Sequence, residues 1–305
     1  MTGRAVAAPL VLVALVLGAC AAPGLDVPPA DILPEGVEIA RFGDARALAG
    51  DGAGRLYVAD AAVSAVVVLR ASGSVLDGAV LDRLGGTDDA PFLDVADVDP
   101  TNGQAVFVAD AGTGRVVRFT AEGRAAETLS VPSLDAAASL PLREADAAET
   151  RTGRPVAVAA GPGNVVYALD AERGVVLRWD ADRTLDRVIG GPASPRPLQA
   201  PTGLVVTDDG DVVVADGGHL VVFDAFGAVR YVVDAAALGR VGSVSLSGGQ
   251  VLAVGPSGLA VLDEGALRGV SVEGRWVDAV VEGDGLYLLT PTRLVRVPAA
   301  RLGAQ

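Results

Sequence analysis

The feature of this 305-residue sequence that most restricts its fold is an internal repeat. Four segments share an apolar run that follows a glycine-containing turn and ends in aspartate: RLYVAD (residues 55–60), AVFVAD (105–110), VVYALD (165–170) and DVVVAD (211–216). The copy over residues 201–233 is the clearest, with apolar runs at residues 204–206, 212–215, 220–223 and 229–233. Runs this short between Asp- and Gly-rich turns predict four antiparallel strands in each copy.

Two weaker copies, GGQVLAVG (residues 248–255) and GDGLYLLT (283–290), bring the number to six. Four-stranded units repeated radially leave only short sheet edges, which is the architecture of a propeller. We therefore expect an all-β fold over residues 37–298, a six-bladed β-propeller of four-stranded antiparallel blades. The last copy supplies only three strands, whereas residues 37–42 (VEIARF) alternate apolar and polar side chains. We expect this N-terminal strand to close the last blade.

The fourth copy resembles an NHL repeat in its Pro201-x-Gly203 start, its Val-Ala-Asp216 strand end and its Phe223-Asp224 before a glycine turn. The resemblance covers most of residues 42–297 and is weak in the last two copies. It also marks Arg115, which follows Ala-Gly-Thr-Gly where NHL repeats often carry Asn-His-Arg, although the histidine is missing here. The resemblance implies a propeller and no particular activity, because propellers have unrelated functions.

The N-terminus has the layout of a secretory signal over residues 1–19. Arg4 precedes an apolar stretch, residues 5–17, that is too short to span a membrane. The junction Leu17-Gly18-Ala19-Cys20 resembles the lipobox of bacterial lipoproteins. That resemblance implies cleavage before Cys20 and acylation, including palmitate, of this cysteine. The alternative is an ordinary signal peptide or an N-terminal core helix that contains a cysteine.

The lipobox also implies a location. We expect a protein anchored by lipid in the bacterial cell envelope, facing the periplasm or the outside. The residue after the cysteine is not Asp, which favours the outer membrane over the inner one. Residues 20–36 are rich in proline and are expected to form a flexible tether, and residues 299–305 form a tail.

Charge and composition exclude several functions. The chain has 38 acidic and 24 basic residues, a net charge of -14, no lysine and one histidine. An acidic surface repels phosphates, so we expect no nucleic-acid partner. Without lysine there is no Schiff-base chemistry and no P-loop, and one histidine rules out a two-histidine metal site.

Four repeated carboxylates are the first candidate ligand-binding groups. They end the second strand of each strong copy and should meet on one face of the propeller: Asp60, Asp110, Asp170 and Asp216. In one interpretation each carboxylate accepts backbone N–H groups and fixes a turn. In the other they bind Ca²⁺ or a cationic ligand as a ring of oxygens. Whether they bind a metal stays open at this point.

Two further candidates and an insertion belong to the same face. His219 follows Asp216-Gly-Gly and is either an acid–base partner of that aspartate or a turn histidine. Arg115 is either a ligand-binding group or part of a surface ion pair. The insertion over residues 130–154, between blades 2 and 3, contains residues 136–148, for which we expect a short amphipathic helix or an unstructured segment.

We expect a non-enzymatic, monomeric module that binds an envelope protein or another envelope ligand and needs no cofactor. The alternative is a Ca²⁺-dependent hydrolase or lyase resembling lactonases, with a carboxylate site on the propeller axis. Asparagine, which those enzymes use at the axis, occurs only at Asn102 and Asn164. Oxygen-bearing side chains from at least three blades converging on the channel would favour binding of an ion or small molecule there.

Overall fold

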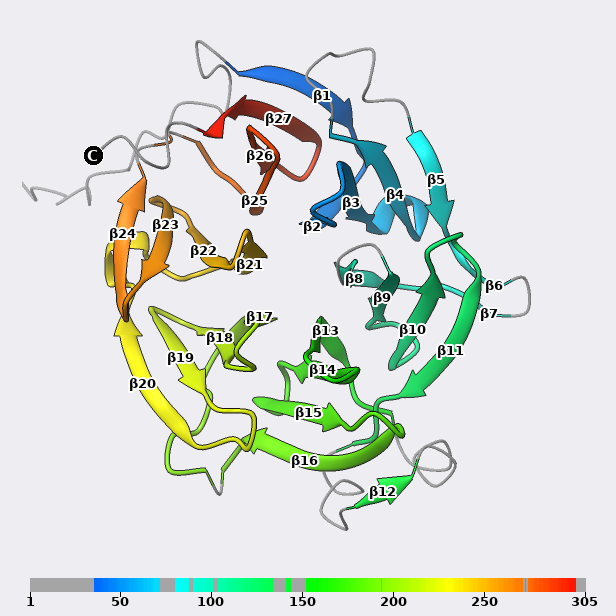
Figure 1. Cartoon of the computed structure of the whole chain (residues 1–305), viewed down its shortest axis with the longest axis vertical. Coiled ribbons are helices and arrows are strands. Elements are labelled where there is room, and N and C mark those ends of the chain that lie inside the picture. Colours follow the sequence, from blue (N-terminus) through cyan, green and yellow to red (C-terminus); the bar gives the residue numbers. More distant parts are fainter. Residues whose placement is uncertain are drawn as a thin grey trace, which may run out of the picture.

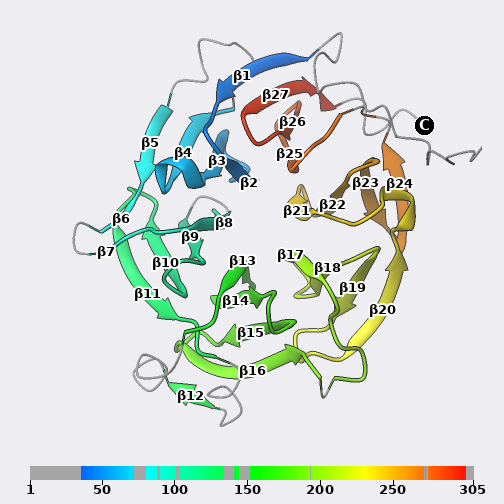
Figure 2. The same ribbon diagram turned by 180° about the vertical axis from the view of Figure 1, so that it is seen from behind.

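Six four-stranded antiparallel sheets stand around a central axis in the computed structural model, as the repeats predict (Figure 1). The structure describes residues 36–71, 80–87, 90–100, 104–133, 141–143, 152–192, 194–270, 272 and 274–299. Figure 2 shows the same ring from behind, with the first strand of each blade nearest the axis. No helix in these ranges is long and apolar enough to cross a membrane. The expected signal, Cys20 and the tether up to residue 35 lie outside the described residues.

The strands of the first three blades follow one another in chain order from the axis outward. Blade 1 contains β2 (Ala45–Gly50), β3 (Arg55–Asp60), β4 (Ala65–Arg70) and β5 (Val80–Leu84), with the 3-10 turn η1 (Ala61–Val63) between β3 and β4. Blade 2 contains β8 (Val95–Asp99), β9 (Ala105–Asp110), β10 (Arg115–Thr120) and β11 (Ala125–Ser130). Blade 3 contains β13 (Pro155–Gly161), β14 (Val165–Asp170), β15 (Val175–Trp179) and β16 (Thr184–Gly190).

The last three blades repeat this order, with the closing strand taken from the N-terminal side. Blade 4 contains β17 (Pro201–Val206), β18 (Val212–Asp216), β19 (His219–Phe223) and β20 (Val229–Asp234). Blade 5 contains β21 (Ser243–Ser247), β22 (Gln250–Gly255), β23 (Gly258–Asp263) and β24 (Ala266–Val270), preceded by η4 (Ala236–Leu238). Blade 6 contains β25 (Asp278–Glu282), β26 (Gly285–Leu289), β27 (Arg293–Pro298) and β1 (Val37–Arg41).

The ring closes where the sequence predicts. Strand β1 pairs antiparallel with β27, from Val37 opposite Arg296 to Arg41 opposite Arg293. Ile39, between them, is 5% exposed and packs in the cluster that joins blade 6 to blade 1. Ile39 is the one buried residue of this strand, and Val37 stays 39% exposed, so the strand closes the blade mainly through its pairing with β27 and the packing of Ile39.

Turn chemistry separates the strands within a blade. In blade 4, the Gly210 N–H donates to the Thr207 carbonyl at 2.8 Å, and Gly210 has φ +84°, a conformation that favours glycine. Gly227 repeats this turn before β20 with φ +87°. These two glycines explain why the Asp-Asp-Gly and Ala-Phe-Gly segments end strands whose β-branched residues would otherwise continue.

The hydrophobic core is divided among the six interfaces between neighbouring blades. Trp179 is fully buried between blades 2 and 3, and Trp276 is buried between blades 5 and 6. Each blade is therefore buried on both faces, which is why the repeated strands are apolar at nearly every position rather than at alternate ones.

Two connections between blades carry additional short strands. The connection between blades 1 and 2 forms the hairpin β6 (Gly86–Thr87) and β7 (Ala90–Pro91). Within the insertion, β12 (Leu142–Arg143) pairs with the outer strand of blade 3, Leu142 opposite Leu185. These two residues form neither the expected helix nor an unstructured segment, because the open edge of β16 offers them backbone partners. Most of residues 136–148 lie outside the described residues.

Candidate functional site

The four repeated aspartates lie at the ends of the second strands and are at most 3% exposed. Each carboxylate accepts a hydrogen bond from the backbone N–H sixteen residues earlier, where the chain enters the same blade. The N···O distances are 2.9 Å from Asp44 to Asp60, 3.0 Å from Asp94 to Asp110, 3.2 Å from Arg154 to Asp170 and 2.6 Å from Ala200 to Asp216. These carboxylates hold the first strand of each blade against the second.

Arg115 lies beside one of these carboxylates. Its Nε is 3.4 Å from Asp110 Oδ2, and its Nη2 donates to the Pro91 carbonyl at 2.9 Å. The guanidinium also lies over the Phe92 ring, 5.8 Å from its centroid. Arg115 therefore connects β10 to the loop between blades 1 and 2.

His219 begins β19 and is exposed, directly opposite Asp216 in the strand pairing. The carboxylate of Asp216 accepts the backbone N–H groups of Gln199 and Ala200 at 2.8 and 2.6 Å. The structure thus brings His219 and Asp216 into neighbouring positions, with Asp216 engaged by the backbone of the preceding loop.

A cavity of about 400 Å³ lies on the axis, lined by the first strand of every blade. The cavity extends along much of the channel. In blade 2 its lining includes Asp97, which pairs with Ala109, the residue directly before Asp110. In blade 4 its lining continues to Thr207 and Asp208, in the turn between the first and second strands. None of the four repeated aspartates, to which the sequence had pointed, lines the cavity.

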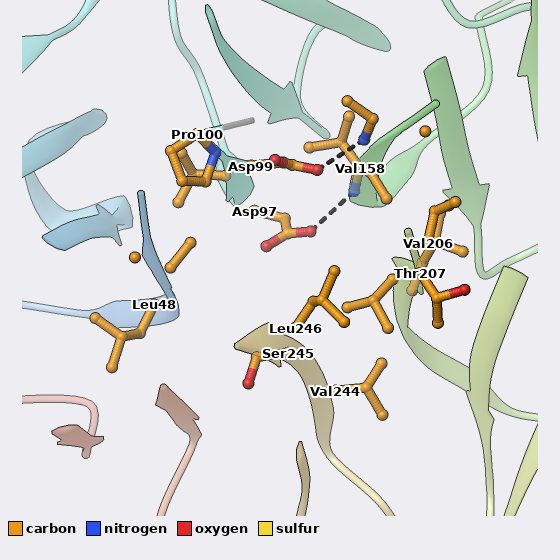
Figure 3. A pocket seen from close by; sticks show the side chains of 18 of the residues that line it. Leu48, Asp97, Asp99, Pro100, Val158, Val206, Thr207, Val244, Ser245 and Leu246 are labelled. Carbon is orange, nitrogen blue, oxygen red and sulfur yellow. Dashed lines mark hydrogen bonds between the residues drawn. The ribbon is translucent and has the colours of Figure 1, made fainter. Parts of the chain in front are cut away.

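Oxygen-bearing side chains from four blades line this cavity: Asp97 and Asp99 from blade 2, Thr207 and Asp208 from blade 4, Ser245 from blade 5, and Asp278 from blade 6. This arrangement meets the condition that the sequence set for binding on the axis. The remaining lining consists of aliphatic residues and backbone, and Figure 3 shows leucines and valines from several blades arranged around the opening.

The carboxylates in the cavity bridge neighbouring blades. Asp97 Oδ2 accepts the Val158 N–H at 2.8 Å, and Asp99 Oδ2 accepts the Ala160 N–H at 2.7 Å. Both donors belong to β13, whose inner edge has no neighbouring strand. The two aspartates satisfy backbone groups that would otherwise face the channel unpaired.

Asp278 joins three blades in the same way. Its Oδ2 accepts the Leu48 N–H of blade 1 at 2.8 Å, and its Oδ1 accepts the Ser243 hydroxyl of blade 5 at 2.9 Å. Glu282, at the other end of β25, accepts the N–H groups of Gly52 and Gly54 at 3.0 and 2.8 Å. Blade 6, completed by the N-terminal strand, is therefore connected to blade 1 by side chains as well as by packing.

The environment raises the pKa of two of these carboxyls. Burial raises the pKa of Asp278 to about 7, although its three hydrogen-bond donors favour the charged form. Burial also raises the pKa of Asp97 well above its usual value, and the nearby Asp278 and Asp99 carboxylates add to the rise. No arginine or histidine is among the residues that line the cavity in the described part of the chain. Near pH 7 the Asp278 carboxyl is therefore protonated in part of the molecules and ionised in the rest.

Within the described residues, no group of three or more His, Cys, Asp or Glu side chains is placed to hold a metal ion. The repeated aspartates belong to separate blades and point into the turns that they stabilise. The axial carboxylates in turn direct an oxygen at the backbone of the next blade.

Sequence reasoning missed Asp97, Asp99 and Asp278. One signal could have found them, because the strand register aligns the first strands of the copies. Asp97 and Asp278 occupy the position held by Ala47, Ala157 and Gly203 in other blades. A carboxylate at a repeat position that other copies fill with a very small residue therefore indicates a group beside the axis.

No protein-family model and no curated protein matches the chain. Solved structures match over most of its length. A streptogramin B lyase is 10% identical with a TM-score of 0.57, over 86% of this chain and 96% of that one. A gluconolactonase from Xanthomonas campestris is 16% identical with a TM-score of 0.61, over 86% and 89%. A chain of the mitotic checkpoint complex is 14% identical with a TM-score of 0.55, over 98% of both. At such identities the likeness shows the propeller fold alone.

The role of the repeated aspartates predicts a stability effect. Asp216→Ala removes the buried carboxylate that accepts the N–H groups of Gln199 and Ala200, and should lower the free energy of unfolding by roughly 1–3 kcal/mol. Asp209→Ala, in an exposed turn of the same blade, should change it by less than about 0.5 kcal/mol. Urea denaturation measures both. Equal stability of the two variants would contradict the structural role.

The raised pKa of Asp278 predicts a pH effect on stability. In the unfolded chain this carboxyl ionises near pH 4, and in the folded chain near pH 7, so the folded state binds more protons between these values. Wild-type stability should therefore fall, relative to that of Asp278→Asn, as the pH rises from 4 to 7. The change in the difference should be on the order of 2–4 kcal/mol. Urea denaturation across this pH range measures it, and a constant difference would refute the shift.

Proposed function

We propose that this propeller is a non-enzymatic binding module that takes a small ligand in its axial cavity. The observation that carries the proposal is the convergence of six oxygen-bearing side chains from four blades on an opening of about 400 Å³. Cavities of this size are typical of small-molecule sites, in which a few polar groups fix the orientation of the ligand between apolar walls.

The chemistry of the cavity favours binding over catalysis. Asp97 and Asp278 accept hydrogen bonds from backbone N–H groups and from a serine, and they hold the ring together. Nucleophilic catalysis needs a nucleophile beside an activating base. The described residues that line the cavity include neither histidine nor lysine.

The alternative, a Ca²⁺-dependent lactonase-like hydrolase or lyase, has less support. A calcium site takes six to eight oxygen ligands, and three or more acidic groups are not gathered around a common point in the described residues. The similarity to a gluconolactonase and to a lyase carries no argument for activity at 16% and 10% identity.

The proposal places this module at the bacterial cell envelope, anchored through Cys20. The support is the signal-like N-terminus and its Leu-Gly-Ala-Cys junction. Cells grown with radiolabelled palmitate should label the protein, and Cys20→Ser should abolish the label. An unlabelled wild-type protein would contradict the anchor and leave the axial site unaffected.

The binding function is tested with a matched pair of variants. Leu246 and Leu267 are both partly buried and pack against the same core cluster, but only Leu246 lines the cavity. Leu246→Trp should fill the cavity, whereas Leu267→Trp adds the same bulk on the outer strand of blade 5. Ligand-observed NMR with a fragment mixture of cationic, neutral and anionic compounds, and the full chain in detergent, measures binding.

We expect fragments that bind the wild type and Leu267→Trp and lose binding in Leu246→Trp. Thermal unfolding confirms that both variants are folded before binding is compared. Folded wild type that binds no fragment, or fragments that bind Leu246→Trp equally well, would overturn the proposed function.

A further inference from the structure

We propose that the axial cavity selects a small organic monocation, an ammonium group carried on an aliphatic body. This inference rests on the proposed function and names the chemical class of its ligand. It follows from three properties of the cavity: the sign of its charge, the neutrality of the groups that hold its carboxylates, and its aliphatic walls.

The charged groups of the cavity all have one sign. In the described part of the chain, no cationic side chain lines it. Its charged lining residues are four aspartates: Asp97, Asp99, Asp208 and Asp278. They come from blades 2, 4 and 6, so the negative potential surrounds the opening rather than covering one wall. Low-dielectric walls strengthen such a potential, which attracts a cation and opposes an anion.

The donors that hold the deepest of these carboxylates are neutral. Asp97 accepts the backbone N–H groups of Val158 and Val98, and Asp278 accepts two backbone N–H groups and a serine hydroxyl. Neutral donors orient a carboxylate without cancelling its charge. Figure 3 shows the second oxygen of Asp97 directed toward the open middle of the ring, away from the oxygen that is bonded to Val158. An ammonium group placed there would gain a charge-assisted hydrogen bond.

Aliphatic side chains form much of the remaining wall. Leucines and valines from five blades line the cavity, several with side chains that also pack between blades: Leu48, Val98, Val158, Leu204, Val205, Val206, Val244 and Leu246. They suit a hydrocarbon body and offer no aromatic face on which a sugar ring or a nucleobase would stack. A single cationic head also needs only one or two carboxylates, whereas a divalent metal needs a gathered set that the described residues lack.

Binding of a cation should release protons. Three other titratable groups line the cavity with Asp97: Asp99 on the same strand, Asp278 on β25 and Asp208 after β17. The lining residues of β2, β13 and β21 include no titratable side chain. The pKa values of Asp97 and Asp278 are raised, that of Asp278 to about 7, so the Asp278 carboxyl is partly protonated near neutral pH. A cation favours their charged forms, and its affinity should therefore fall as the pH is lowered below 7.

The test compares three probes of nearly the same shape: cyclohexylamine, cyclohexanol and cyclohexanecarboxylate. Isothermal titration calorimetry with the full chain in detergent at pH 7.5 should give at least about tenfold tighter binding of the amine than of the alcohol. The carboxylate should not bind. Lowering the pH to 5.5 should weaken amine binding by about tenfold, and titrations in two buffers of different ionisation enthalpy should report proton release.

A matched pair of variants locates the effect. Asp97→Asn keeps an oxygen that can accept the Val158 N–H. It should lower the affinity for the amine about tenfold and leave the affinity for the alcohol unchanged. Asp263→Asn removes the same charge from the outer strand region of blade 5, where Asp263 pairs with Arg268, and should leave both affinities unchanged.

The outcomes separate this inference from the proposed function. Equal or tighter binding of the alcohol or the carboxylate, lost in Leu246→Trp, would keep the binding module and overturn the ligand class. Amine binding that is unchanged in Asp97→Asn would also overturn it. Folded protein that binds none of the three probes nor any fragment would overturn both proposals.

Discussion

The inner edges of the blades impose the constraint on which the rest of this structure depends. The first strand of each blade has a neighbour on one side only, so its other backbone groups face the channel. In this chain, side chains of the adjacent blade satisfy several of these groups. Asp97 and Asp99 accept N–H groups of blade 3, and Asp278 accepts the Leu48 N–H of blade 1. The Ser245 hydroxyl donates to the Ala279 carbonyl of blade 6.

The same constraint explains why carboxylates persist in an otherwise aliphatic channel. Burying them raises the pKa of Asp97 and Asp278, which costs stability near neutral pH, while their hydrogen bonds join blades that share no strand pairing. A ligand that compensates their charge would recover part of this cost. The structural role of the carboxylates and the proposed choice of ligand thus have a common physical origin.

Two sets of carboxylates have different roles in the ring. The repeated aspartates stabilise the entry of the chain into its own blade, and their spacing of sixteen residues from the donor is the same in four blades. The axial aspartates Asp97, Asp99 and Asp278 instead accept hydrogen bonds from the backbone of a different blade. The aspartates that recur in every strong copy stabilise the fold, whereas those that depart from the repeat line the cavity.

Much of the fold follows from local sequence, because glycine turns and Val-Ala-Asp strand ends specify each blade without reference to the others. The closing role of residues 37–41 was also predictable from their alternation. Strand β12 was not, since the edge that it joins lies more than forty residues further along the chain. The contacts of Asp278 with Leu48 depend on which strands meet at the axis after ring closure, and they link positions 230 residues apart. In blades 5 and 6, Gly255 and Thr290 take the place of the repeated aspartate. The repeat pattern was therefore weakest in the blades next to the point where the ring closes.

The most direct test of this account is a ¹³C NMR titration of the aspartate carboxyl carbons in the full chain, assigned with Asp97→Asn and Asp278→Asn. The account predicts one axial carboxyl titrating near pH 7 and a second shifted upward from the usual aspartate range, each signal missing from its own variant. It also predicts that saturating cyclohexylamine moves both midpoints to lower pH. If both axial carboxyls ionise near pH 4 and their midpoints do not move when the amine is added, the cavity does not hold uncompensated carboxylates, which would contradict the proposed choice of ligand.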